Sequence, residues 1–126
     1  MGSWIYGCDL CQQACPWQRF AQPTAISFFH STSPDRAAPR LPDLLALDDA
    51  GFHRRFAGTP ILRSGRARLL RNVAVALGNS GDPRATPALE AARNDPAALV
   101  REHAAWALAA LRTAPNAPPG PDLELR

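Results

Sequence analysis

The hydrophobic residues in the middle of the chain recur at helical spacing. In the stretch that begins at Arg66, apolar side chains fall at i, i+4, i+7 and i+8, which places them on one helical face: Leu69, Val73, Ala76 and Leu77. Gly78 follows directly and is expected to end this helix. A later stretch predicts a second helix with a similar apolar face: Val100, Ala104, Ala107, Leu108 and Leu111. No alternation of the kind found in strands competes here, so we expect a mostly α fold.

Capping residues mark where the other helices begin. Pro42 precedes a short helical stretch over residues 43–47, and Asp48 or Asp49 is expected to cap a helix that runs to Phe56 and is closed by Gly58. Three dipeptides have the form of an N-cap followed by proline at the first helical position: Thr59-Pro60, Asp82-Pro83 and Asp95-Pro96. The second of these is expected to open a helix that ends near Ala92.

The two main helices resemble each other. A shift of about 31 residues superimposes one set of positions, Leu69, Val73, Ala74, Ala76 and Leu77, on another, Val100, Ala104, Ala105, Ala107 and Leu108. A period in this range with alternating helices is typical of an α-solenoid of HEAT type. The alternative is an unrelated helical hairpin with alanine-rich packing. Only about two units fit, and so short a stack normally needs another domain to cover its ends.

Composition and length place these helices in one small domain with appendages. The chain has 126 residues, of which 46% are hydrophobic and 20% are charged, as in globular proteins. We expect three parts: residues 1–40 with the cysteines and loop signals, a helical domain over residues 41–112, and a disordered tail over residues 113–126. No apolar run is long enough to span a bilayer and no signal peptide is evident, so a cytoplasmic location is expected.

Three cysteines near the N-terminus supply the candidate chemistry. Cys8, Cys11 and Cys15 form the pattern C-x2-C-x3-C, and Pro16 follows the last of them. This pattern equals the last three cysteines of a bacterial ferredoxin run, in which the final cysteine reaches a second cluster. Thiolates suit iron because they are soft, charged ligands. A 4Fe–4S cluster needs four of them, so ligands from outside the chain would be required.

Two other interpretations of the cysteines remain open. The spacing i, i+3, i+7 also places the three thiols on one face of a helix, where they would pack as small hydrophobic side chains. Alternatively, the three cysteines and either His30 or His53 would bind zinc.

Three strings resemble the epoxyqueuosine reductase family. The string WIYGCDLCQQACPW at residues 4–17 is similar to its second ferredoxin-type motif, although Gln18 stands where the family more usually has asparagine. Two further strings, LLRNVAVALGN at residues 69–79 and HAAWAL at residues 103–108, resemble segments of its HEAT-like C-terminal domain. Their order and spacing agree with the family over roughly residues 3–112.

The resemblance implies a fold, an activity and cofactors. The family reduces epoxyqueuosine to queuosine at the wobble position of certain transfer RNAs and uses cobalamin and two 4Fe–4S clusters. By matching residues, Cys8 and Cys11 would ligate one cluster and Cys15 the other. The cobalamin domain lies upstream in the family, and this chain has no room for it. We therefore expect a partial ferredoxin-like iron–sulfur segment followed by a HEAT-like domain, inactive alone and completed by the missing N-terminal portion in cis or in trans.

Basic residues suggest where RNA would bind. The net charge is +3, and every basic residue apart from histidine is arginine, which favours anionic partners, although an arginine-rich genome would leave the same mark. Four arginines cluster at one predicted helix start and are candidates for contacts with a tRNA anticodon stem-loop: Arg63, Arg66, Arg68 and Arg71. The alternative is a solvated helix face.

The tryptophan side chains allow two roles. Trp4, Trp17 and Trp106 would either stack on RNA bases or pack within the protein, and packing is favoured. In that case Trp106 packs in its alanine-rich helix and Trp17 shields a cluster, while His103 is expected to be a satisfied core histidine. If the resemblance is set aside, the alternative function is a stand-alone HEAT-like interaction module whose cysteines hold zinc or nothing.

Overall fold

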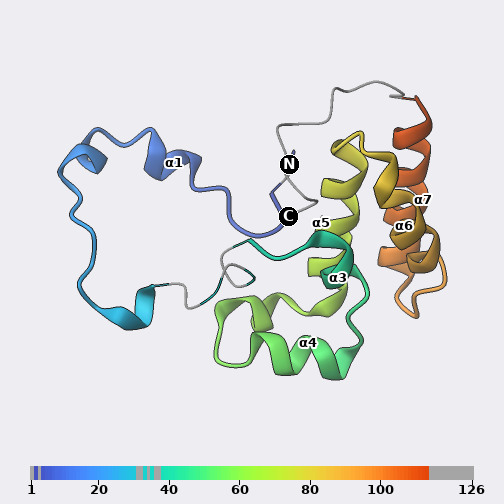
Figure 1. Ribbon diagram of the computed structural model, residues 1–126, viewed down its shortest axis with the longest axis horizontal. Coiled ribbons are helices and arrows are strands. Elements are labelled where there is room, and N and C mark those ends of the chain that lie inside the picture. Colours follow the sequence, from blue (N-terminus) through green and yellow to red (C-terminus); the bar gives the residue numbers. More distant parts are fainter. Residues whose placement is uncertain (1, 3, 31–32, 34, 36–37, 114–126) are drawn as a thin grey trace.

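The chain consists of helices joined by loops, with no strand in the residues described by the computed structural model: 2, 4–30, 33, 35 and 38–113 (Figure 1). The α-helices are α1 (Leu10–Gln13), α3 (Leu41–Leu45), α4 (Asp49–Phe56), α5 (Arg66–Asn79), α6 (Thr86–Ala92) and α7 (Ala98–Thr113). Four 3-10 helices connect them: η1 (Pro16–Phe20), η2 (Ser27–Phe29), η3 (Pro60–Ser64) and η4 (Pro83–Ala85). The mostly α prediction is confirmed.

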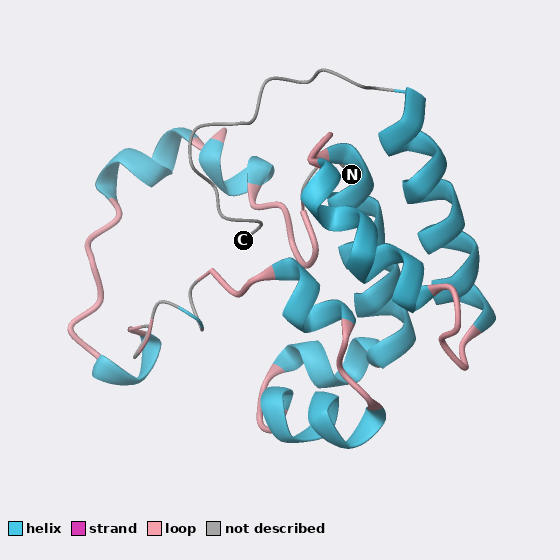
Figure 2. Ribbon diagram, turned by 45° about the vertical axis from the view of Figure 1, so that its right-hand side comes forward, coloured by secondary structure: helices cyan, strands magenta, loops and turns pink. Residues whose placement is uncertain are grey.

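Residues 41–113 form a helical body in which the two long helices lie side by side. α5 and α7 pack against each other along their length, as Figures 1 and 2 show from two directions. α3 packs on α5, α6 packs on α7, and α3 and α6 also touch. Two helix pairs are thereby stacked, which is the arrangement expected for two solenoid units.

The core of the body is the predicted apolar face of each long helix. Buried residues on α5 include Leu69, Val73, Ala76 and Leu77, and those on α7 are Val100, Ala104, Ala107 and Leu108. Side chains from α3, α4 and α6 complete the core, among them Leu44, Phe52 and Leu89. The 31-residue shift thus relates positions that are buried in both helices, although Ala105, the counterpart of the buried Ala74, is exposed.

Gly78 has a different role from the predicted one. α5 does not end there but continues to Asn79, and Gly78 is buried against α7. A Cβ atom at this position would lie 2.8 Å from both Cα and Cβ of Ala107. The glycine therefore lets the two long helices approach closely. Glycine is typical both of helix ends and of close contacts between helices. The prediction that Gly78 ends the helix was wrong because the sequence does not distinguish these two roles.

Capping follows the sequence at some helices and not at others. Asp48 caps α4 as predicted, because its carboxylate accepts a hydrogen bond from the Gly51 N–H at 2.6 Å. Thr59 makes no capping bond; its hydroxyl donates instead to the Phe56 carbonyl at 2.8 Å. α3 begins at Leu41, before Pro42, slightly earlier than predicted. The tail expected from residue 113 lies outside the described residues, except that Thr113 still belongs to α7.

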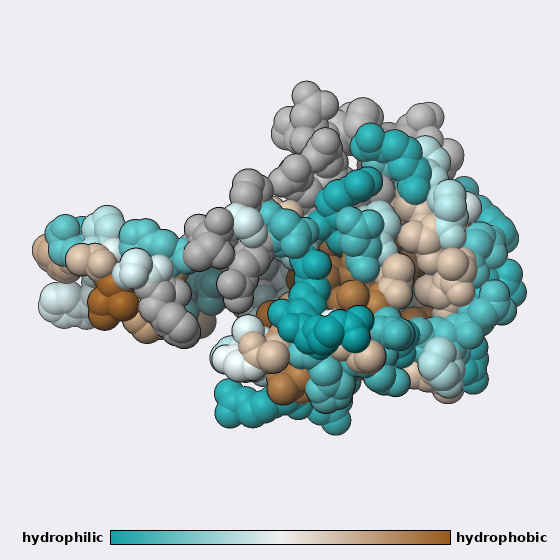
Figure 3. All heavy atoms as spheres, turned by 60° about the horizontal axis from the view of Figure 1, so that its bottom comes forward, coloured by the Kyte–Doolittle hydropathy of each residue, from teal (hydrophilic) through white to brown (hydrophobic). Residues whose placement is uncertain are grey.

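Residues 4–30 form an arm that starts against the body and then extends away from it (Figures 1 and 3). None of the arm residues whose burial is described is buried, and only Ile5 and Cys15 are partly covered. Large hydrophobic side chains lie on its surface: Trp4, Tyr6, Leu10, Trp17, Phe20, Ile26 and Phe29. Among the helices of the described residues, none combines the length and the apolar character needed to cross a membrane.

Candidate functional site

The cysteine segment is a tight sequence of turns. Asp9 adopts a left-handed conformation with φ 48°, and α1 follows as a single helical turn that contains Cys11. The chain is then fixed around Cys15, whose N–H donates to the Gln12 carbonyl at 3.0 Å and whose carbonyl accepts from the Gln18 N–H at 3.0 Å. Pro16 opens η1, so the proline of the motif also starts a helical turn.

The three thiols are free and accessible. Cys8 and Cys11 are exposed and Cys15 is half-buried, so the interpretation of a buried helical face is not supported. Within the part of the chain that the structure describes, no three side chains of His, Cys, Asp or Glu are gathered closely enough to hold a metal ion. His30, one of the candidate zinc ligands, donates from Nε2 to the Thr24 carbonyl at 2.7 Å. His53 lies in α4, on the helical body.

Aromatic side chains follow the last cysteine. The rings of Trp17 and Phe20 have centroids 5.7 Å apart, and the guanidinium carbon of Arg19 lies 4.7 Å from the Phe20 centroid. Trp17 is nevertheless 75% exposed. In this arrangement, a role in shielding a cluster requires a further surface that covers the ring from outside.

Two asparagines of α5 hold the chain that leads into the cysteine segment. The Nδ2 amide of Asn72 donates to the Ile5 carbonyl at 2.9 Å, and that of Asn79 donates to the Gly2 carbonyl at 2.8 Å. The two asparagines are seven residues apart and therefore lie on one face of α5. The Ile5 side chain packs against the core of the body. These contacts fix the start of the arm on the helical body.

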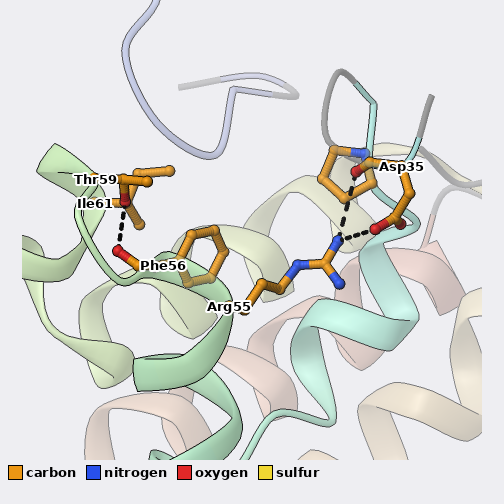
Figure 4. A pocket seen from close by; sticks show the side chains of 6 residues that line it. Asp35, Arg55, Phe56, Thr59 and Ile61 are labelled. Atoms are coloured by element: carbon orange, nitrogen blue, oxygen red, sulfur yellow. Dashed lines mark hydrogen bonds and ion pairs between the residues drawn. The ribbon is translucent and has the colours of Figure 1, made fainter. Parts of the chain in front are cut away.

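A second attachment lies where the chain enters the body. Arg55 of α4 forms an ion pair with Asp35, with 2.7 Å between Nη2 and Oδ2 (Figure 4). The pair borders a cavity of about 330 Å³ that is also lined by Pro39, Phe56, Thr59 and Ile61. Because both side chains are partly exposed, we expect this ion pair to contribute less than about 1 kcal/mol to stability.

Of the four arginines predicted to bind RNA, Arg66 has an internal role. Its guanidinium forms an ion pair with Asp95, and a second contact, from Nη1 to Oδ1, measures 3.2 Å. Its Nε also donates to the Leu47 carbonyl at 2.6 Å. The Arg66 side chain is only 11% exposed and that of Asp95 only 6%. Arg66 therefore joins three parts of the body and is not presented on its surface.

The partners of Asp95 keep its carboxyl group ionised. Burial alone would raise the pKa of Asp95, but hydrogen bonds from Arg66 and from the Ala97 N–H, together with attraction to Arg66 and Arg101, outweigh it. The net result is a lowered pKa. The Ala97 N–H donates to Oδ1 of Asp95 at 2.9 Å, so the same carboxylate also closes the turn before α7.

The other three arginines differ in exposure. Arg63 in η3 and Arg68 in α5 are exposed, whereas Arg71 is half-buried. The Nε of Arg71 is buried and has no hydrogen-bond partner within the described residues. Arg68 and Arg71 are one helical turn apart, so they lie on the same side of α5.

Sequence reasoning missed two features of this region. The seven-residue spacing of Asn72 and Asn79, which places two amides on one helix face, is the signal that would have indicated their shared role. Trp106 was expected to pack in the interior, but it is 48% exposed. His103 is half-buried and satisfied through Nδ1, which is 2.8 Å from the Leu99 carbonyl, as expected of a structural histidine.

Comparison with known proteins confirms both the repeat and the resemblance. A family model of HEAT repeats matches residues 59–119. The chain is 51% identical over 110 residues to an epoxyqueuosine reductase of Xanthomonas campestris. The aligned region covers 86% of this chain and 31% of the relative. Proteins of the same name from Pseudomonas aeruginosa and Escherichia coli are 45% and 44% identical, again over 86% of this chain, and are covered to 30% and 28%.

The similarity covers only part of each relative. The chain spans about a third of the length of these curated relatives, and the match falls in a C-terminal portion of them. No solved structure matches the chain.

Proposed function

Since the chain is homologous over most of its length to a C-terminal portion of epoxyqueuosine reductases, we propose that it serves such an enzyme by supplying iron–sulfur ligands and by docking the transfer RNA. The observation that carries the proposal is the combination of two elements in one chain. A C-x2-C-x3-C-P segment is attached by its leading residues to a HEAT-like helical body. A redox segment and a large helical surface are thereby kept together.

The cysteine segment fits an iron–sulfur cluster in donor type but not in donor number. Its three free thiols are exposed or half-exposed, and thiolates are the ligands that such clusters use. Each 4Fe–4S cluster requires four thiolates. In the proposed assignment, Cys8 and Cys11 ligate one cluster and Cys15 ligates the other, so both clusters need further donors from outside this chain. A bound cluster carries single electrons, and the upstream part of the enzyme supplies the remaining ligands.

Iron and sulfide analysis tests the ligand assignment. After anaerobic reconstitution, the chain mixed with the upstream portion of a relative is expected to hold iron and sulfide stoichiometrically, while the chain alone holds less. Cys8→Ser, Cys11→Ser and Cys15→Ser should each reduce the iron content of the mixture. Gln13→Ser, an exposed change in the same segment, is the matched control and should leave it unchanged. Stoichiometric zinc, or no metal, would overturn the assignment and favour the interaction module.

The helical body is proposed to contact the phosphates of an anticodon stem-loop. The exposed Arg63 and Arg68 carry this contact, with Arg71 beside them, because guanidinium groups bind phosphate well and RNA stems are recognised largely through their backbone. Arg66 takes no part, since its guanidinium is engaged with Asp95.

Salt dependence of RNA binding tests the contact. Arg63→Ala and Arg68→Ala should each weaken binding of an anticodon stem-loop and lower the slope of log K against log salt by about 1. Arg112→Ala, an exposed arginine near the end of α7, is the control and should change neither. Equal effects of all three substitutions would mean that the contact is diffuse net charge rather than this surface.

The complete reaction is proposed for the whole enzyme and not for these 126 residues. We expect no turnover of epoxyqueuosine-containing tRNA by the chain alone with added cobalamin, because the cobalamin domain is not in the matched region. Product analysis of the tRNA nucleosides checks this expectation, and turnover by the chain alone would contradict it.

A further inference from the structure

A tryptophan lies open on the outer side of the two long helices. Trp106 of α7 is 48% exposed, although its neighbours Ala104 and Ala107 are buried. It borders a cavity of about 330 Å³, together with Val75 of α5 and with Glu102 and His103 of α7. That volume falls at the lower end of the range for small-molecule sites, about 300–1,000 Å³.

The tryptophan ring is held in place by the close contact of α5 with α7. A Cβ atom at Gly78 would lie 3.2 Å from Cζ3 of Trp106, so the ring already rests against the backbone of α5. Val75 and Trp106 are 31 residues apart and therefore occupy equivalent positions in the two repeat units. The cavity is thus located in the seam between the units. A ring fixed in this way presents an aromatic surface that does not need to be ordered on binding.

The Glu102 carboxylate is the acceptor that the cavity offers to a ligand. The His103 Nδ1 lies 2.8 Å from the Leu99 carbonyl, and because a carbonyl only accepts, Nδ1 donates this bond and is occupied within the helix. The lining therefore suits a flat ligand with apolar faces and with N–H donors along one edge.

The charge near the cavity favours a nucleotide over an organic cation. Arg71 and Arg68 precede Val75 by four and seven residues on α5, which places them on the same side of the helix. Their positive charges would attract a phosphate and repel a quaternary ammonium group. A basic surface next to an exposed aromatic ring is the combination that binds unpaired nucleic acid.

We propose that this cavity receives one unpaired base of the bound RNA, stacked on Trp106, and that guanine is preferred. Guanine alone among the common bases presents two adjacent donors, N1–H and N2–H₂, which match a carboxylate such as that of Glu102. The inference rests on the proposed RNA docking, to which it adds a site for a base. Arg68 and Arg71 hold the adjoining phosphates.

A double-mutant cycle between protein and RNA tests the stacking. Trp106→Ala should weaken binding of a stem-loop RNA about 5- to 150-fold, the usual range for loss of one stacked base. Single abasic substitutions are introduced along the loop, and at one position the abasic RNA should bind wild type and Trp106→Ala equally well. Trp106→Phe keeps a smaller ring and should lose less. Phe20→Ala removes an exposed ring of the arm and should leave the RNA affinity unchanged.

Inosine tests the choice of base, because it lacks the N2 amino group. At the coupled position, replacing guanine by inosine should weaken binding to wild type about 5-fold or more. The same replacement should matter little in Glu102→Gln. Equal binding of guanine and inosine by wild type would overturn the guanine assignment.

The outcomes separate this inference from the proposed function. If wild type binds no RNA, the docking proposal and the base site fail together. If wild type binds RNA but Trp106→Ala and Trp106→Phe bind with the same affinity and show no coupling, only the base site is wrong. Quenching of tryptophan fluorescence by choline, absent in Trp106→Phe, together with no such coupling, would identify a cation site instead.

Discussion

The helical body and the arm both carry large hydrophobic side chains, but only the body buries them. The body encloses Leu44, Phe52, Leu70 and many others, whereas the arm leaves Trp17 and its neighbours in contact with water. A segment of this kind gains little free energy from its own packing. We therefore expect the body to fold through its own interactions and the conformation of the arm to depend on its partners, which in the proposed function are iron–sulfur clusters and the upstream part of the enzyme.

Core truncation should show the largest difference between the two regions. Leu70 is fully buried in α5, and Leu70→Ala is expected to lower the free energy of unfolding by about 4 kcal/mol through lost burial and a cavity. Trp17→Ala removes a larger side chain from the arm, yet the expected change is below about 0.5 kcal/mol. Urea unfolding followed by circular dichroism measures both. A comparable loss in Trp17→Ala would mean that the arm belongs to the cooperative unit.

Removal of the buried charge pair is expected to have the next largest effect. Asp95→Asn leaves the enclosed Arg66 guanidinium without its counter-charge and should lower the free energy of unfolding by about 3 kcal/mol. Glu90→Gln, which removes an exposed carboxylate paired with Arg93, is the control and should cost about 0.5 kcal/mol or less.

The same pair gives a pH dependence with a definite sign. The pKa of Asp95 is lower in the folded state than its ordinary value of about 3.9, so its contribution is complete above that pH and is lost as the pH falls through the folded value. Wild type should therefore lose stability below about pH 4 more steeply than Asp95→Asn. Urea midpoints measured from pH 5 downward check this, and parallel curves for the two proteins would contradict it.

Gly78→Ala tests how closely the two long helices approach each other. Alanine is the better helix former by about 1 kcal/mol, but its Cβ would meet Ala107, and overpacking costs about 1–3 kcal/mol. We expect a net loss of about 1 kcal/mol in Gly78→Ala. Ala105→Gly, at an exposed site on α7, reports helix propensity alone. A stabilised Gly78→Ala would show that the helices have room to spare.

The asparagine contacts should give the smallest effect and locate the boundary between the regions. Asn72→Ala or Asn79→Ala removes one hydrogen bond to the start of the arm, worth about 1 kcal/mol. Hydrogen exchange should quicken at backbone amides of residues 4–7 and stay unchanged in α7. Asn94→Ala, an exposed asparagine elsewhere in the body, should leave both segments as they are. Unchanged exchange in the double variant would mean that Ile5 alone holds the arm.

The apolar faces of α5 and α7 could be predicted from sequence because burial on a helix leaves a regular spacing. The 31-residue shift predicted the repeat for the same reason, and Asp48 was recognised because its capping bond is local. Gly78 was misassigned, since a glycine in sequence does not reveal whether it ends a helix or admits a neighbour. Both roles depend on the absence of a side chain at glycine.

The candidate site could be predicted only where its chemistry lies in consecutive residues. The cysteine spacing identifies three thiols, but the sequence does not predict the internal role of Arg66, because its partners, Leu47 and Asp95, are 19 and 29 positions away. The exposure of Trp106 depends on which faces of α5 and α7 pack together. The sequence of either helix alone does not determine this. Such contacts between distant segments are absent from any local pattern.

The three-way contact of Arg66 also has a mechanical consequence. Solenoids often unravel one unit at a time from an end, because each unit touches only its neighbours. Here the guanidinium of Arg66 is hydrogen-bonded to the Leu47 carbonyl, which precedes α5, and paired with the Asp95 carboxylate, which precedes α7. Separation of α7 from the body would leave the largely buried guanidinium without its counter-charge. Under tension applied between residues 41 and 113, the body should therefore rupture in one step, and Arg66→Met should divide that event in two.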